Sequence, residues 1–255
     1  MSVAAPVPSD LRHHAQTIAL LVRWQLGRQA MYLPLLVVVQ VLMAVATVAG
    51  YGLLVGDPDP AAALYLATGA PTITLVVVGL VMTPQSVATA RTEGSHDWMR
   101  SLPVPRSLFL VADLALWTVL ALPGVVMGVL AGAVRFDVTL DLAWWLPLAV
   151  VVVSMTSAAV GYAIALTLAP PIAMLLSQVL VFFVLLFSPI SFPRDRMPGW
   201  LATAHDWLPV EPMAQAVRAG LARTTFDMPG RSVVVLGAWC VASIALAALA
   251  LRRRA

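Results

Sequence analysis

Three polar side chains, Gln40, Asp113 and Gln178, stand inside apolar stretches of the sequence, where they are the best candidates for chemistry. A carboxylate within a bilayer is costly, so Asp113 is a candidate proton relay or transport-path residue. Arg106 precedes Asp113 by about two helical turns, so the alternative is a boundary residue that is hydrated or paired with an arginine of the preceding loop. Gln40 and Gln178 either face a transport path or hydrogen-bond another helix.

The sequence carries no motif for soluble enzyme chemistry. All 15 basic residues are arginine, and a phosphate-binding P-loop needs the lysine of G-x-x-x-x-G-K-[ST]. The patterns CxxC, HExxH and GxSxG are absent as well. Cys240 is better explained as a small buried apolar side chain, and the pair His13–His14 as solvated, than as ligands. We therefore expect no catalytic residue, cofactor site or metal site in this chain.

Composition predicts an all-α integral membrane protein. Of the 255 residues, 61% are hydrophobic and 11% are charged, whereas soluble domains carry about 25% charged residues. The arginines flank apolar segments and do not form one basic face, which makes membrane lipid a partner and argues against nucleic acid. A span needs ~20 mostly apolar residues, and Pro84 is expected to kink the second span near its inner end. The six predicted spans are residues 31–55, 64–90, 108–134, 144–168, 171–187 and 232–251.

Arginine positions predict the topology. Residues 1–30, the loop 91–106 and the tail 252–255 are rich in arginine, whereas the short loops between the other spans hold mainly aspartate. The positive-inside rule therefore places both termini in the cytoplasm of a multi-pass protein of the bacterial inner membrane. Residues 1–30 include an amphipathic stretch, for which we expect an interfacial helix on the cytoplasmic surface.

Two segments outside the spans have unusual composition. Residues 188–231 are too polar and too proline-rich to cross a bilayer, yet too apolar for a solvated loop. We expect one or two short helices there, lying in or dipping into the outer face of the membrane.

The loop 91–106 is short and charged, and Trp98 and Met99 would form an apolar knob for a cytoplasmic partner. The alternative for this loop is an ordinary solvated turn.

Both segments resemble the permease subunit of ABC-2 type exporters. In that family the inner loop carries E-G-[ST]-x-[DE], a short apolar turn and P-V-x-R, and the outer segment carries an MPxW-like element, a proline pair and an arginine. This sequence departs from the inner pattern at His96 and Arg100. The inner match comprises Glu93, Gly94, Ser95, Asp97, Pro103, Val104 and Arg106, and the outer match comprises Pro189, Met197, Pro198, Gly199, Trp200, Pro209, Pro212 and Arg218.

The resemblance implies roles for these residues. The inner loop would be a coupling helix that docks into a separate ATPase subunit, and the outer segment would form an outer gate. The outer segment has Glu211 where the family often has asparagine, which either adds a negative charge at the gate or pairs with Arg218. The implied coupling residues are Glu93, Gly94, Asp97, Trp98, Met99, Pro103 and Arg106, and the implied gate residues are Pro198, Trp200, Pro209, Glu211, Pro212 and Arg218.

The third predicted span contains Gly124, Gly128 and Gly132 at four-residue spacing. Glycines at this spacing form flat patches on one helix face, where another helix can approach closely. The pattern predicts helix packing, either within the subunit or across a dimer.

The resemblance implies a permease subunit that exports an amphipathic or lipophilic substrate, such as an antibiotic, drug or natural product. Two permease subunits, identical or related, would work with two ATPase subunits that bind ATP and Mg²⁺. A lipid or a lipid-linked polysaccharide is the alternative substrate. The main alternative function is a proton-driven secondary transporter that uses Asp113, and a weaker one is a membrane scaffold or membrane-anchored enzyme.

Overall fold

The structure is a computed structural model that describes residues 11–94 and 104–253. Within these residues it is a bundle of α-helices without a β-strand, and one isolated bridge joins Asp141 to Ala222. Six of the described helices are long and apolar enough to cross a bilayer, which confirms the predicted fold class. They are α2 (Leu33–Val55), the continuous α3–η1–α4 (Pro60–Val77, Val78–Met82 and Thr83–Thr92), α6 (Arg106–Phe136), α7 (Leu146–Thr167), α8 (Pro170–Phe187) and α11 (Gly230–Arg253).

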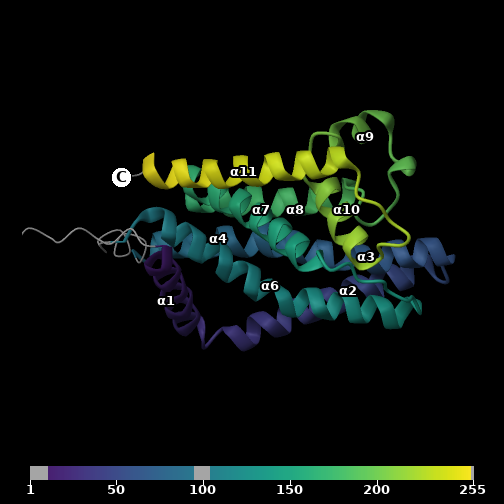
Figure 1. Cartoon of the computed structure of the whole chain (residues 1–255), viewed down its shortest axis with the longest axis horizontal. Helices are drawn as coiled ribbons and strands as arrows, with labels where there is room; N and C mark the ends of the chain where they lie inside the picture. Colours follow the sequence, from purple (N-terminus) through teal and green to yellow (C-terminus); the bar gives the residue numbers. More distant parts are fainter. Residues whose placement is uncertain (1–10, 95–103, 254–255) are drawn as a thin grey trace, which may run out of the picture.

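The remaining described helices lie at the two ends of the bundle (Figure 1). Helix α1 (Leu11–Gln29) is steeply inclined to the spans, packs on α6, and lies at the end of the bundle where α4 and α11 have their C-terminal ends. We call this the α1 end. The 3₁₀-helix η2 (Arg194–Arg196), α9 (Gly199–His205) and α10 (Val210–Leu221) follow α8 and lie at the opposite end, which we call the α9 end.

Local sequence explains several helix boundaries. The side chain of Asp59 accepts hydrogen bonds from the backbone of Ala61 and Ala62 at 3.0 and 2.9 Å, so it caps α3, and Pro60 occupies the first helical position. Helix α4 ends before Gly94, whose φ of +74° suits glycine. Proline also lies in the first turn of α2, α7 and α8, where its missing N–H costs nothing.

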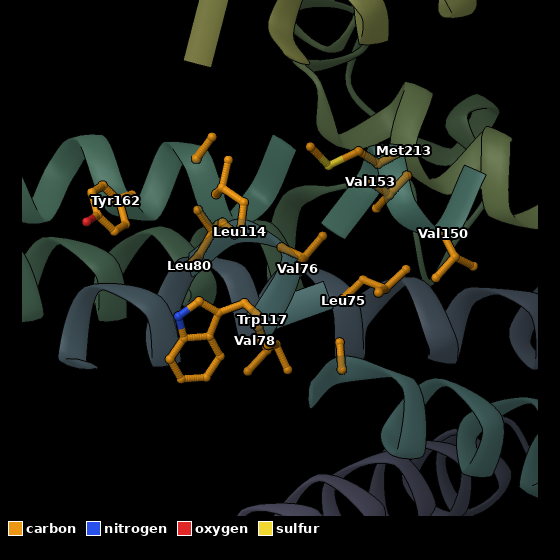
Figure 2. Close-up of a cluster of buried hydrophobic side chains, with 14 of the residues drawn as sticks. Leu75, Val76, Val78, Leu80, Leu114, Trp117, Val150, Val153, Tyr162 and Met213 are labelled. Atoms are coloured by element: carbon orange, nitrogen blue, oxygen red, sulfur yellow. The ribbon is translucent and has the colours of Figure 1, made fainter. Parts of the chain in front are cut away.

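The second span forms the core of the bundle. In its most apolar stretch 89% of the residues are buried, against 17% in α2 and 22% in α8 and in α11. Its side chains Leu75 and Val78 pack among Leu114 and Trp117 of α6 and Val153 of α7 (Figure 2). Most of the surface of α2, α8 and α11 is therefore left for lipid or for another subunit.

The second span widens into a π-helix, Val78–Met82, two residues before Pro84. Proline lacks an N–H and its ring collides with the preceding turn, and a π-helical turn relieves this collision without ending the helix. Where a kink was expected near Pro84, the helix thus continues through a local widening. Here the span crosses α7 very closely: a Cβ atom added to Gly161 would lie 2.2 Å from the carbonyl oxygen of Gly79.

The three evenly spaced glycines of α6 pack within the subunit. Added Cβ atoms would meet Thr74 at Gly124, Pro71 at Gly128 and Ala67 at Gly132, all of them residues of α3. Gly124 and Gly128 also face Gln40 and Ala44 of α2. The glycine face is therefore the seam along which α6 packs against α3 and α2.

Candidate functional sites at the two ends of the bundle

The predicted coupling loop starts and ends at the α1 end. Glu93 is exposed and follows the last turn of α4, and Arg106 is the first residue of α6. Gly94 directly follows Glu93. Four further predicted coupling residues lie outside the described residues: Asp97, Trp98, Met99 and Pro103. A coupling helix in this loop therefore stays a prediction.

Arg91 ties the start of this loop to the end of α7. Its guanidinium donates hydrogen bonds to the carbonyl oxygens of Ala165 and of Leu168, the latter at 2.7 Å. These carbonyls belong to the C-terminal end of α7, where a cation is favourable, and the following Pro170 and Pro171 have no N–H to donate. Sequence reasoning missed this contact because Arg91 lies 74 residues before Ala165 and 77 before Leu168.

Asp113 joins three helices near the α1 end. Its carboxylate accepts a hydrogen bond from the side chain of Gln25 in α1 and forms another with the buried hydroxyl of Tyr162 in α7. Asp113 itself is half-buried in α6. The carboxylate therefore fastens the inclined helix α1 to the bundle, which is a structural function that the sequence did not reveal.

The two intramembrane glutamines do not converge with Asp113. Gln40 is buried, and its amide nitrogen lies 3.9 Å from the sulfur of Met82. Gln178 lies at the middle of α8 with its side chain exposed on the surface of the subunit. The three polar residues are therefore not assembled into one relay within the subunit.

An ion-pair network holds the α9 end together. The guanidinium of Arg194 bonds to Glu211 at 3.0 Å and to Asp206 at 2.6 Å, and Arg231 of α11 reaches the same Asp206 at 3.1 Å. Gln215 donates to Glu211 at 3.0 Å. The hydrogen bond from Arg194 lowers the pKa of Asp206, and Asp206 in turn raises the pKa of Arg194. Helices η2, α9, α10 and α11 are thereby linked.

Arg218 is buried beneath this network. It is 4% exposed, and its guanidinium carbon lies 3.5 Å from the centre of the Tyr65 ring, a cation–π contact with α3. Its Nη2 donates to the carbonyl of Ile190 at 2.9 Å and its Nε to Thr68 at 3.3 Å. Burial lowers the pKa of Arg218. The alternative in which Arg218 pairs with Glu211 is wrong, because the carboxylate of Glu211 is bound by Arg194 and Gln215.

The predicted gate residues divide into two groups. Glu211, Pro212 and Arg218 are buried on α10, and Pro209 is buried just before it. Pro198 and Trp200 stand at the start of α9 and are exposed, with Trp200 at 72%. Sequence reasoning missed the partners Tyr65, Thr68, Arg194, Asp206 and Arg231, because they come from other elements.

Six apolar helices, with further helices at both ends, define a multi-pass membrane protein. The chain belongs to the ABC-2 type transporter family, whose model matches residues 16–222. It is therefore the membrane permease component of an ABC transporter and not the catalytic subunit, and family membership implies partnership with an ABC ATPase. No curated protein matches the sequence.

Proposed function

We propose that this protein is the permease subunit of an ATP-driven exporter of amphipathic substrates, powered by a separate ATPase. The observation that carries the proposal is the family match over residues 16–222 of a six-span bundle. The chain has no lysine and hence no P-loop, so ATP and Mg²⁺ would bind to the partner. The α1 end, where arginines are frequent, would face the cytoplasm.

The loop 91–106 is the proposed docking site for the ATPase. It connects the buried second span to α6, and its first arginine, Arg91, is bonded to the end of α7. A displacement of the two ends of this loop would therefore move the second span, α6 and α7 together. The movement would open a path at the α9 end, where the network around Arg194 and Glu211 is the proposed gate.

Two features support an amphipathic or lipophilic substrate. The spans carry few charged side chains, and the surfaces that α2 and α8 leave exposed are largely apolar. An ion or a free sugar would need polar groups along its route, because unsatisfied polar groups in a bilayer are costly. A drug-like natural product fits these walls, and a lipid or lipid-linked glycan is the alternative substrate.

A second permease subunit would lie against α8. Gln178 projects from the middle of this apolar helix, where lipid offers its amide no hydrogen-bond partner. A second copy or a related subunit would supply one. A Gln178→Cys variant in a Cys240→Ala background should cross-link to a dimer in membranes, whereas the control Val241→Cys, exposed on α11, should not. Equal cross-linking of both would contradict this interface.

The experiment that tests the function is purification of the tagged protein from its host in mild detergent, followed by mass spectrometry and reconstitution into proteoliposomes. We expect a stoichiometric ATPase to co-purify and substrate uptake to require ATP. Glu93→Ala and Trp98→Ala should retain membrane insertion but lose coupled transport. Asp57→Ala is the matched control, since Asp57 is also exposed but precedes the opposite end of the same span.

The same liposomes separate the proposal from a proton-driven mechanism. An uncoupler should leave transport intact, and removal of ATP should abolish it. Transport that persists without ATP, stops with the uncoupler and is lost in Asp113→Asn would overturn the proposed energy source.

A further inference from the structure

We infer that each subunit carries a binding site for a zwitterionic single-chain amphiphile at the α9 end, between α8 and α11. This site is separate from the proposed coupling loop and does not depend on the direction or energy source of transport. It consists of an apolar cavity and a polar cavity that share the side chain of His205.

The apolar cavity lies between spans that do not pack tightly on each other. Helices α8 and α11 both pack on α7, and the cavity of about 190 Å³ fills the space between them. It is lined by residues of several elements, among them Leu80 of η1, Val160 of α7, Val184 of α8, Met213 of α10 and Trp239 of α11. An apolar cavity of about 150 Å³ takes up benzene, so this one accommodates an aromatic ring or a segment of an alkyl chain.

The polar cavity adjoins the apolar one at His205. It has a volume of about 180 Å³ and is lined by Arg194, Asp206, Glu211 and Arg231. The two arginines and two carboxylates pair with one another in the network described above, so the lining carries no large excess of either charge, and a bound headgroup would exchange with these pairs. Such a lining suits a headgroup that bears both a phosphate-like anion and a cation, because each charge meets its opposite.

The order of the two cavities matches the order of groups in a lipid. Most residues of the polar cavity come from the segment 194–229, whereas the apolar cavity extends from this segment to residues within the spans, such as Val76, Leu80 and Val160. Trp200 and Trp207 are each 72% exposed at this end, as expected for side chains at a membrane–water boundary. An amphiphile bound with its chain between α8 and α11 and its headgroup beside Arg231 would keep the orientation it has in the bilayer.

Trp239 lines the apolar cavity and is hydrogen-bonded to the α9 end. Its indole nitrogen donates to the carbonyl oxygen of Trp207 at 2.7 Å, which connects α11 to the segment between α9 and α10. A bound chain would therefore be held between this bridge and Phe183 of α8, which is 43% exposed. Gln178 faces another side of α8, about 200° around the helix from the cavity residue Leu180, so the site does not compete with the proposed dimer contact.

The test is photo-crosslinking of the full chain in nanodiscs with a lysophosphatidylcholine that carries a diazirine in its acyl chain, followed by peptide mapping. We expect labelling to concentrate on peptides of α8, α10 and α11 that line the cavity. Val184→Phe fills the cavity and should reduce this labelling at least fivefold. The matched control Val179→Phe adds the same volume at an exposed position of α8 that does not line the cavity, and it should leave the labelling unchanged.

The headgroup assignment has its own control pair. Arg231 and Arg223 have side chains exposed to 55% and 56%, and each pairs with an aspartate, but only Arg231 lines the polar cavity. Arg231→Gln should reduce labelling about threefold or more, and Arg223→Gln should not. A monoacylglycerol probe with the same chain should label the cavity less than the zwitterionic probe does.

Three results would overturn the inference. One is labelling spread evenly over all lipid-exposed helices. Another is equal labelling in the wild type and in Val184→Phe, provided that the variant elutes as a folded protein. If Val184→Phe fails to fold, equal labelling in Arg231→Gln and Arg223→Gln overturns it instead.

Discussion

The close crossing of the second span and α7 offers a sharp test of the structure, because one added methyl group should disturb it. Gly161 of α7 faces the π-helical turn of the second span. In Gly161→Ala the new Cβ would lie 2.2 Å from the carbonyl oxygen of Gly79 and 2.9 Å from Cδ of Pro84, whereas contacts under 3.0 Å essentially never occur. Backbone and a proline ring cannot rotate away, so the two helices must separate.

The expected magnitude follows from two opposing effects. Overpacking a core costs about 1–3 kcal/mol, and a rigid backbone neighbour places this site near the upper value. Replacing glycine by alanine within a helix recovers about 0.5–1 kcal/mol. The net loss is then about 2 kcal/mol, which corresponds to a fall in Tm of about 4–8 °C for a chain of this size.

Gly128→Ala in α6 is the matched control. Its added Cβ would lie 3.4 Å or more from its nearest neighbours, the backbone of Pro71, which is ordinary contact. Its Tm should therefore stay within about 2 °C of the wild type or rise slightly. The assay is thermal unfolding of the purified proteins in detergent, followed by intrinsic fluorescence, with size-exclusion chromatography to verify folding. Equal Tm values for the two variants would refute the close crossing of the second span and α7.

Three further predictions concern the charged side chains at the two ends. Arg218→Lys should lower the Tm by about 2–6 °C, because an ammonium cannot replace the stacked guanidinium and its hydrogen bonds. The control Arg196→Lys, at an exposed position, should leave the Tm unchanged. The pKa of Asp206 is lowered in the folded protein, so its stabilising effect is present above its ordinary pKa of about 3.9 and is lost as the pH falls through the folded value. Asp206→Asn should therefore be less stable than the wild type at pH 7 and lose less stability between pH 7 and pH 3. Parallel plots of Tm against pH for the two proteins would contradict this. Arg91→Gln should lower the Tm and weaken ATPase coupling, because the carbonyl groups at the end of α7 lose the guanidinium that binds them. The control Arg252→Gln, at an exposed position, should change neither the Tm nor the coupling.

The network at the α9 end shows why partner choice escaped sequence reasoning. Glu211 and Arg218 are seven residues apart, which made them a reasonable pair on one helix. In the structure Glu211 binds Arg194, 17 residues earlier, and Arg218 binds Thr68, 150 residues earlier. These pairs depend on how η2, α10 and α3 pack, and no local spacing encodes that packing.

The sequence by itself determined the class of protein, the six spans and the family. Each of these depends on contiguous residues: hydrophobic runs long enough for a bilayer, and short motifs in the loop 91–106 and the segment 188–231. It also identified the glycine face of α6 as a packing surface.

Only the tertiary structure decided what these features contact. It placed the glycine face against α3 and α2, bound Asp113 to Gln25 of α1, and left Gln178 exposed on α8. It also showed that the helix near Pro84, where a kink was expected, contains a π-helical turn that packs against Gly161. The physical reason is that hydrophobicity drives a segment into lipid regardless of its neighbours, whereas close packing and buried hydrogen bonds exist only once particular helix faces have met.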